Sequence, residues 1–128
     1  MIQRPRLLVV DDDPDFRRLV SHTLRRHFFV VEAKDGCEGY SRALSVTPDI
    51  ILLDMHMEGW SGLETLKKFR ELPRMAYLPI VMLTSDSQRE TVVQAIQAGA
   101  SDYVLKTGLN QAELVTRLMH LIPTKVEA

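Results

Sequence analysis

Five polar residues of the sequence stand at the ends of short apolar runs. These residues are Asp11, Asp12, Asp54, Thr84 and Lys106. The runs are rich in Val, Ile and Leu and comprise Arg6–Val10, Asp49–Leu53, Pro79–Leu83 and Asp102–Leu105. If these runs are parallel strands, their carboxyl ends share one edge of a sheet, which is where open α/β sheets bind ligands. Three carboxylates, a hydroxyl and an ammonium would meet there, a combination that suits a divalent cation and a phosphoryl group.

Carboxylates grouped at one edge need a positive partner. Two like charges about 4 Å apart repel by about 4 kcal/mol at an effective dielectric near 20, so three of them together predict a bound cation. Mg²⁺ fits, because it prefers hard oxygen ligands and commonly takes one or two carboxylates together with phosphate oxygens. The sequence therefore predicts a Mg²⁺ site that fills only weakly until a phosphate group arrives.

The hydroxyl and the ammonium complete a site for phosphoryl transfer. This reaction mainly needs the three equatorial oxygens to be positioned and neutralised, and a carboxylate such as Asp54 can be the nucleophile. The metal, Lys106 and Thr84 would each take one oxygen. Taken singly, each polar residue has an ordinary structural explanation as an acidic helix cap, a strand-end turn or a surface lysine. Their joint occurrence at four strand ends is what indicates a site.

Segments of helical periodicity alternate with the apolar runs. Phe28–Ala33 is a further predicted strand, more polar at its end and suited to an edge of the sheet. The alternation predicts an α/β fold, a doubly wound five-stranded parallel sheet flanked by five helices on both faces. The other four strands are almost continuously apolar, as strands buried on both faces should be.

Capping residues and periodicity predict how the helices begin and which side faces the sheet. Asp13, Ser87 and Asn110 are predicted caps, and Asp35-Gly36 is a turn before another helix. The residues predicted to face inward are Phe16, Leu19, Val20, Thr23 and Leu24 in the first helix; Tyr40, Ala43 and Leu44 in the second; Leu63, Leu66 and Phe69 in the third; Val92, Val93 and Ile96 in the fourth; and Ala112, Val115, Leu118, Met119 and Ile122 in the last. The basic residues of the first helix are interpreted as a solvated face: Arg17, Arg18, Arg25 and Arg26.

Length and composition predict one cytoplasmic domain. The 128 residues suit a single domain over 1–128, with a short polar tail at 123–128 and no output domain. A net charge of −1 gives no electrostatic reason to expect direct nucleic-acid or membrane binding. Cys37 is the one cysteine, which fits a reducing compartment. Neither a signal peptide nor an apolar stretch long enough for membrane insertion is evident.

The ordered set of motifs resembles the receiver domain of two-component response regulators, in particular its chemotaxis-regulator-like members. The similarity extends over essentially the whole chain. The separations of 30 residues from Asp54 to Thr84 and 22 from Thr84 to Lys106 are also those of that family. The matching segments are Leu7–Asp13, Ile51–Met57 followed by Gly62 at the expected offset, Val81–Ser85 and Gly99–Lys106.

The resemblance implies a flavodoxin-like receiver fold with strand order 2-1-3-4-5 and a phosphoprotein that carries an aspartyl phosphate. Asp54 would take its phosphoryl group from the phosphohistidine of a sensor histidine kinase or a phosphotransfer protein. Mg²⁺ would be bound by Asp12, Asp54 and the backbone carbonyl of His56, with Asp11 acting mainly through water. The side chain of His56 would line the rim of the site, where it could tune hydrolysis.

The resemblance also implies how phosphorylation is passed on. Thr84 and Lys106 would contact the phosphoryl group, and Tyr103 would move together with Thr84 as a switch. The change would reach the surface of helix four, strand five and helix five, which a downstream protein, an output domain or a second copy in a homodimer would bind. The chain would catalyse only its own phosphotransfer and dephosphorylation and would not be an enzyme for separate substrates.

Two residues depart from the family pattern. Glu58 follows Met57 where a proline is common, and Thr107 follows Lys106 where the family usually has a cis proline. A cis bond before a residue other than proline costs roughly 2.5–4 kcal/mol. We therefore expect a trans Lys106–Thr107 bond and a rearranged loop after the fifth strand.

Three alternatives remain open at this point. The first is a receiver-like docking module that acts without phosphorylation. The second is a haloacid-dehalogenase-like phosphatase or phosphotransferase, which would typically carry a second Asp where His56 stands. The third is an FMN-binding flavodoxin, but the aspartates after the first strand would repel the phosphate of that cofactor.

Overall fold

The computed structural model describes residues 4–123 and has the alternation of strands and helices that the sequence predicts. In chain order the elements are β1 (Arg6–Val10), α1 (Pro14–Leu24), β2 (Phe29–Ala33), α2 (Gly36–Val46), β3 (Ile50–Leu53), α3 (Gly62–Glu71), the short 3₁₀ helix η1 (Pro73–Met75), β4 (Ile80–Thr84), α4 (Arg89–Gln97), β5 (Asp102–Leu105) and α5 (Gln111–Leu121). Residues 124–128 of the predicted tail lie outside the described residues. None of the described helices is long and apolar enough to cross a membrane.

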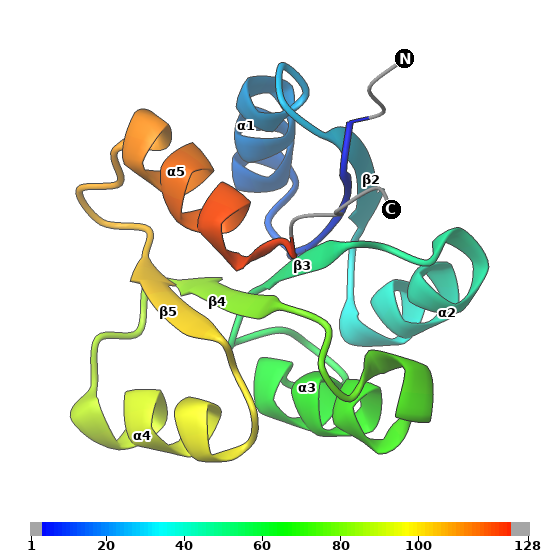
Figure 1. Ribbon diagram of the computed structural model, residues 1–128. Helices are drawn as coiled ribbons and strands as arrows, with labels where there is room; N and C mark the ends of the chain where they lie inside the picture. The colour runs from blue at the N-terminus through cyan, green and yellow to red at the C-terminus, as the bar shows by residue number, and fades with distance from the viewer. Residues whose placement is uncertain (1–3, 124–128) are drawn as a thin grey trace.

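The five strands form one parallel sheet in the order β2-β1-β3-β4-β5, which confirms the predicted strand order. α1 and α5 cover one face of the sheet, and α2, α3 and α4 cover the other (Figure 1). β1 and β3 are neighbours, and Val10 at the end of β1 lies opposite Leu53 at the end of β3. The residues that follow these two strands are therefore brought together at one edge of the sheet.

β3 is the central strand of two hydrophobic cores. Its residues Ile50–Leu53 are each at most 1% exposed. Because side chains alternate along a strand, Ile50 and Leu52 belong to the cluster that includes residues of α1 and α5, whereas Ile51 and Leu53 belong to the cluster that includes residues of α2 and α3. Burying a side chain of this size contributes about 1.5–3 kcal/mol, so both cores hold the strand that ends at the candidate site.

Two of the three predicted helix caps are confirmed. The side chains of Asp13 and Asn110 accept backbone N–H bonds in the first turns of α1 and α5. The prediction for Ser87 is wrong, because α4 begins one residue later than expected and its N-cap is Gln88. The carboxylate of Asp86 accepts the N–H of Gln88 at 2.9 Å, so Asp86 and not Ser87 holds the backbone just before α4.

The inward faces of four helices are narrower than periodicity predicts. Leu19 is 56% exposed, Leu44 39%, Val93 43% and Ile96 48%, and Ala112 of α5 is exposed as well, although all five were expected to face the sheet. In α4 the residue that is fully buried is Ala95, since a small side chain lets the helix lie close to the edge of the sheet. Val93 and Ile96 therefore lie on the flanks of α4 and form part of the protein surface.

Gly62 fixes the loop that follows the phosphoacceptor position predicted at Asp54. Its N–H donates to the carbonyl of Met55 at 2.8 Å, and it begins α3. A Cβ atom at this position would lie 2.0 Å from the Asp54 carbonyl oxygen and 2.5 Å from the Met55 Cα. Both of these are backbone atoms, which cannot move aside as a flexible side chain would. The first turn of α3 therefore packs directly against the backbone of Asp54.

Replacing Gly62 should damage both stability and the site. We expect Gly62→Ala to lower the free energy of unfolding by at least about 2 kcal/mol, because the new methyl group overpacks against backbone. The matched control is Gly59→Asn in the same loop, where φ is +78° and nothing would surround the new Cβ. Urea unfolding of both variants measures the difference, and equal stabilities would contradict this account of Gly62.

Candidate phosphoacceptor and metal site

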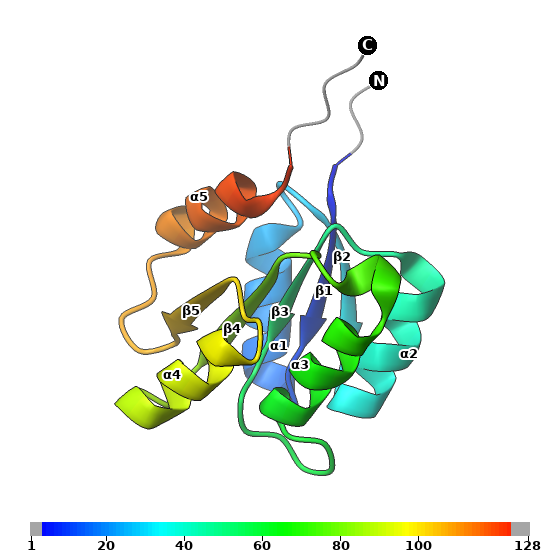
Figure 2. The same cartoon turned by 60° about the horizontal axis from the view of Figure 1, so that its bottom comes forward.

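The carboxylates of Asp11, Asp12 and Asp54 meet at the carboxyl edge of the sheet, as the sequence predicts. Each offers an oxygen, and these atoms all lie within 4.8 Å of one another. Asp11 and Asp54 are buried, whereas Asp12 is exposed. In Figure 2 the strand arrows of β1 and β3 run toward the loop between β3 and α3, which borders this edge. The group is thus open to solvent on the side of Asp12 and closed on the side of the cores.

Lys106 is the positive partner of this group. Its Nζ lies 2.7 Å from Asp11 Oδ2 and 3.3 Å from Asp54 Oδ2. Burial by itself lowers the pKa of Lys106, but its hydrogen bonds and proximity to Asp11 and Asp54 outweigh burial and raise that pKa above its ordinary value. Burial raises the pKa of Asp11 more than the bond from Lys106 lowers it. Three carboxylates facing one ammonium retain an excess of negative charge.

The donor set fits a divalent cation that prefers oxygen. Carboxylate oxygens are the hard ligands that Mg²⁺ takes in proteins, and Mg²⁺ keeps part of its water shell. Asp12 is exposed, and from the described residues it accepts only a long hydrogen bond of 3.4 Å, from the backbone N–H of Glu58. Its other oxygen positions therefore face solvent, where a hydrated ion can reach them.

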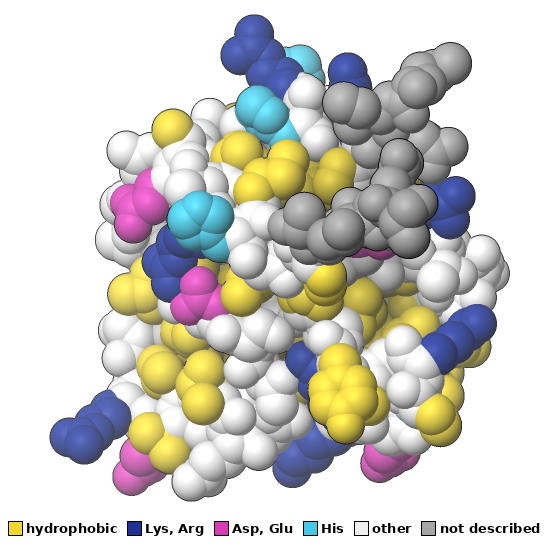
Figure 3. Space-filling model, viewed as in Figure 1, with side chains coloured by type: hydrophobic (Ala, Val, Ile, Leu, Met, Phe, Trp, Pro, Cys, Tyr) yellow, Lys and Arg dark blue, Asp and Glu magenta, His cyan; other side chains and the backbone are white. Residues whose placement is uncertain are grey.

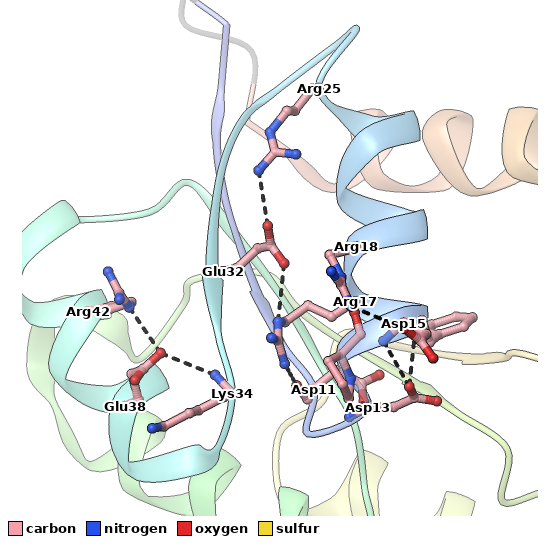
Figure 4. Close-up of polar contacts among 12 residues, drawn as sticks. Asp11, Asp13, Asp15, Arg17, Arg18, Arg25, Glu32, Lys34, Glu38 and Arg42 are labelled. Carbon is pink, nitrogen blue, oxygen red and sulfur yellow. Dashed lines mark hydrogen bonds and ion pairs between the residues drawn. The ribbon is translucent and has the colours of Figure 1, made fainter.

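Arg17 holds the backbone of the loop that carries Asp11 and Asp12. This contradicts the interpretation of its charge as part of a solvated face. Its side chain is only 17% exposed and donates to the backbone carbonyl of Asp11 at 2.7 Å. Glu32 of β2 lies between two guanidiniums, 3.1 Å from Arg17 and 3.0 Å from Arg25 (Figure 4). Glu32 was a charged residue in an otherwise apolar strand, and this was the sequence signal for a buried partner on the neighbouring helix.

The loop between β4 and α4 joins Thr84 to Tyr103. Thr84 is buried, and its Oγ1 accepts the N–H of Asp86 at 3.3 Å. The Tyr103 hydroxyl donates to the carbonyl of Asp86 at 2.6 Å, and burial together with the charges of Asp86 and Asp54 raises the pKa of Tyr103 to about 12. Tyr103 is thus a protonated donor at neutral pH. Asp86, which the sequence analysis did not identify, contacts both side chains and so links the Thr84 hydroxyl to the Tyr103 hydroxyl.

His56 lies at the mouth of the site. Its ring is exposed, and Nε2 lies 2.5 Å from Asp86 Oδ2. The bond from His56, together with the N–H of Gln88, holds the pKa of Asp86 below its usual value. The pair connects the loop after β3 with the loop after β4. The peptide bond between Lys106 and Thr107 is trans, as expected, since no bond in the described residues is cis.

Comparison with known proteins identifies the class of protein to which the chain belongs. Residues 7–119 match the model of the response regulator receiver domain, and the chain belongs to this family of two-component signalling domains. The structure of chemotaxis protein CheY4 from Vibrio cholerae superposes with a TM-score of 0.87 at 30% identity, over 93% of this chain and 99% of that one. The receiver fold and the resemblance read from the motifs are therefore confirmed.

Curated relatives carry the same domain within longer proteins. The transcriptional regulatory protein ResD of Bacillus subtilis is 36% identical over 91% of this chain, which spans 48% of ResD. Hybrid signal transduction histidine kinase D of Dictyostelium discoideum is 35% identical over 95% of this chain, which spans 8% of that kinase. The similarity thus extends to the receiver portion of these proteins and not to their remaining length.

Removing the charge of Lys106 should strengthen Mg²⁺ binding. The ammonium lies against two carboxylates of the proposed metal site, so that it repels an incoming cation. We expect Lys106→Met to bind Mg²⁺ roughly tenfold more tightly than the wild type. Isothermal titration calorimetry measures this, with Lys67→Met on the exposed side of α3 as the control. An affinity for Mg²⁺ that falls or stays the same in Lys106→Met would contradict the prediction.

Proposed function

We propose that this chain is a phosphorylation-controlled signalling switch in which Asp54 is the phosphoacceptor. An Oδ of Asp54 attacks the phosphorus of a phosphohistidine on a histidine kinase or phosphotransfer protein. The new P–O bond forms as the P–N bond breaks, and the imidazole leaves with the electron pair. The observation that carries the proposal is the convergence of Asp54 with two further carboxylates and Lys106 at the edge of a receiver fold.

Mg²⁺ is the cofactor that this donor set suits. Asp12, Asp54 and the backbone carbonyl of His56 would hold the ion, with Asp11 acting mainly through bound water. When bound, the ion neutralises charge on the carboxylates and on the phosphoryl oxygens. Its support here is the fit of three convergent carboxylates to an ion with hard oxygen ligands.

Two side chains would bind the remaining phosphoryl oxygens. Lys106 already lies 3.3 Å from the Asp54 oxygen, so its ammonium can pair with a phosphoryl group on that oxygen with little movement. Thr84 would turn its hydroxyl from Asp86 to the phosphoryl group and donate its proton there. In that state the N–H of Asp86 loses the acceptor that it has now.

The movement of Thr84 would reach the surface through Tyr103. Because Asp86 contacts both residues, a shift of this loop changes the acceptor of the Tyr103 hydroxyl. Val93 and Ile96 of α4 and Leu105 of β5 are exposed, and hydrophobic side chains gather over α4 and β5 in Figure 3. A downstream protein, an output domain or a second copy would bind this surface. No contact with nucleic acid is proposed.

The pair of His56 and Asp86 would govern how the switch is reset. Dephosphorylation needs a water molecule in line with the P–O bond of the aspartyl phosphate. The pair bridges the loops after β3 and β4, where it would limit the approach of water from that side. The chain would thus catalyse only its own phosphorylation and hydrolysis.

Phosphorylation should require the carboxylate of Asp54 and should not require an aspartate outside the site. We expect acetyl phosphate with Mg²⁺ to add one phosphoryl group to the wild type, and Asp54→Asn to remain unmodified because an amide oxygen is a poor nucleophile. The control is Asp49→Asn just before the opposite end of β3, where the carboxylate accepts the N–H of Arg6 and an amide oxygen can replace it. Intact-mass spectrometry reads the product, and equal labelling of Asp54→Asn would refute the assignment.

Removing the Thr84 hydroxyl should abolish the conformational response while phosphorylation of Asp54 continues. Thr84→Val keeps the shape of this buried side chain and removes one hydrogen bond, so we expect phosphorylation to persist within about tenfold. The response of α4 and β5, followed as backbone amide shifts in NMR on adding acetyl phosphate, should be largely lost. Ser87→Ala, on the exposed part of the same loop, is the control. A full α4 and β5 response in Thr84→Val would show that the hydroxyl is not the sensor.

A further inference from the structure

The ammonium of Lys106 has a third neighbour besides its two carboxylates. Nζ lies 4.3 Å from the centroid of the Phe16 ring, within the distance at which a cation is attracted to the face of an aromatic ring. The Lys106 side chain is only 14% exposed, so the attraction is weakened little by water. Phe16 and Lys106 are 90 residues apart in the chain.

The ring of Phe16 is held by the same segment that carries the aspartates. Its backbone N–H donates to the capping carboxylate of Asp13 at 3.3 Å, in the first turn of α1. The ring is partly buried against the hydrophobic cluster that includes residues of α1 and α5. The position of the ring is therefore set by the helix cap and the core and does not depend on Lys106.

The Lys106 side chain lacks comparable support from its own loop. Its backbone is anchored, because its N–H donates to the Thr84 carbonyl at 2.9 Å. The following residues Thr107 and Gly108 are exposed, and nothing lies within 4 Å of the position where a Cβ of Gly108 would be. A flexible four-carbon stem must therefore be oriented by what surrounds its ammonium.

The three neighbours of the ammonium differ in what phosphorylation does to them. In the proposed function Asp54 becomes an acyl phosphate, and Asp11 would act on the cation mainly through bound water. Both carboxylates that now hold Nζ therefore change partner during the reaction. The Phe16 ring takes no part in the chemistry, so it is the contact of Nζ that is the same before and after transfer.

We propose that Phe16 is a positioning residue, whose ring face holds the Lys106 ammonium in line with the oxygen atoms of the phosphoryl group on Asp54. This inference rests on the proposed function of Asp54 and deepens it. A ring that merely packed against the apolar stem of Lys106 could be replaced by any side chain of similar size. A ring that binds the ammonium needs its π electrons.

The experiment compares side chains at position 16 in the full chain. We expect Phe16→Leu to slow phosphorylation by acetyl phosphate with Mg²⁺ roughly threefold to thirtyfold, whereas Phe16→Tyr stays within about twofold. Phe29→Leu on the edge strand β2, where the ring is 60% exposed, should not change the rate. Fluorinated phenylalanines at position 16 keep the shape but withdraw electrons from the ring, and the rate should fall with each added fluorine.

A second readout does not depend on phosphorylation. The Hε protons of Lys106 should resonate upfield of the range for lysines in water in the wild type, because they lie over the Phe16 ring, and should return to that range in Phe16→Leu, whereas those of Lys68, which lies over the Trp60 ring, should stay unchanged. In a Lys106→Met background, Phe16→Leu should slow the residual rate no further. Unchanged rates across the fluorinated series, or ordinary Hε shifts in the wild type, would overturn the positioning role. Failure of Asp54 to be labelled would instead overturn the proposed function, and the proton shifts would then decide the Phe16 contact alone.

Discussion

The repulsion among three carboxylates at the end of a parallel sheet is the constraint on which the site depends. β1 and β3 are adjacent and in register, so the residues that follow them must meet. Asp11 and Asp54 are buried there, where charge is poorly solvated, and Lys106 is the cation that now holds them together. This balance of charge is incomplete, which is the physical basis for the proposed binding of a metal ion and a phosphoryl group.

Much of the surrounding structure holds the backbone around these charges. Gly62 packs α3 against the carbonyl of Asp54. Arg17, which Glu32 orients, donates to the carbonyl of Asp11 from the other side. Both contacts act on the backbone and use none of the carboxylate oxygens. The loops are therefore held through their backbone, and of the three carboxylates that of Asp12, which accepts only a long bond from Glu58 among the described residues, has the most open ligand positions.

Asp86 connects the site to the face on which α4 and β5 lie. Its N–H, carbonyl and carboxylate contact Thr84, Tyr103 and His56 respectively. One short loop thus joins the proposed sensor of the phosphoryl group, the proposed switch residue and the mouth of the site. In the proposed function, a change at Thr84 would alter the hydrogen bonds of this loop and so provide a physical route from charge at the sheet edge to the protein surface.

The sequence by itself determined the architecture and the chemical character of the site. Apolar runs of strand length alternate with helical periodicity, and polar residues stand at the run ends, so that strand adjacency alone brings Asp11 and Asp54 together. Local signals of this kind also identified the caps at Asp13 and Asn110, because a cap is made within a few residues.

Only the tertiary structure decided which side chains support that site. The contact of Lys106 with Phe16 joins residues 90 apart, and that of Arg17 with Glu32 joins a helix to the next strand; both depend on helix orientation and rotamer direction. For the same reason periodicity placed Val93 and Ile96 inside, whereas the closeness of α4 to the sheet at Ala95 leaves them outside. Periodicity specifies the face of a helix, and packing against its neighbours determines how wide that face is.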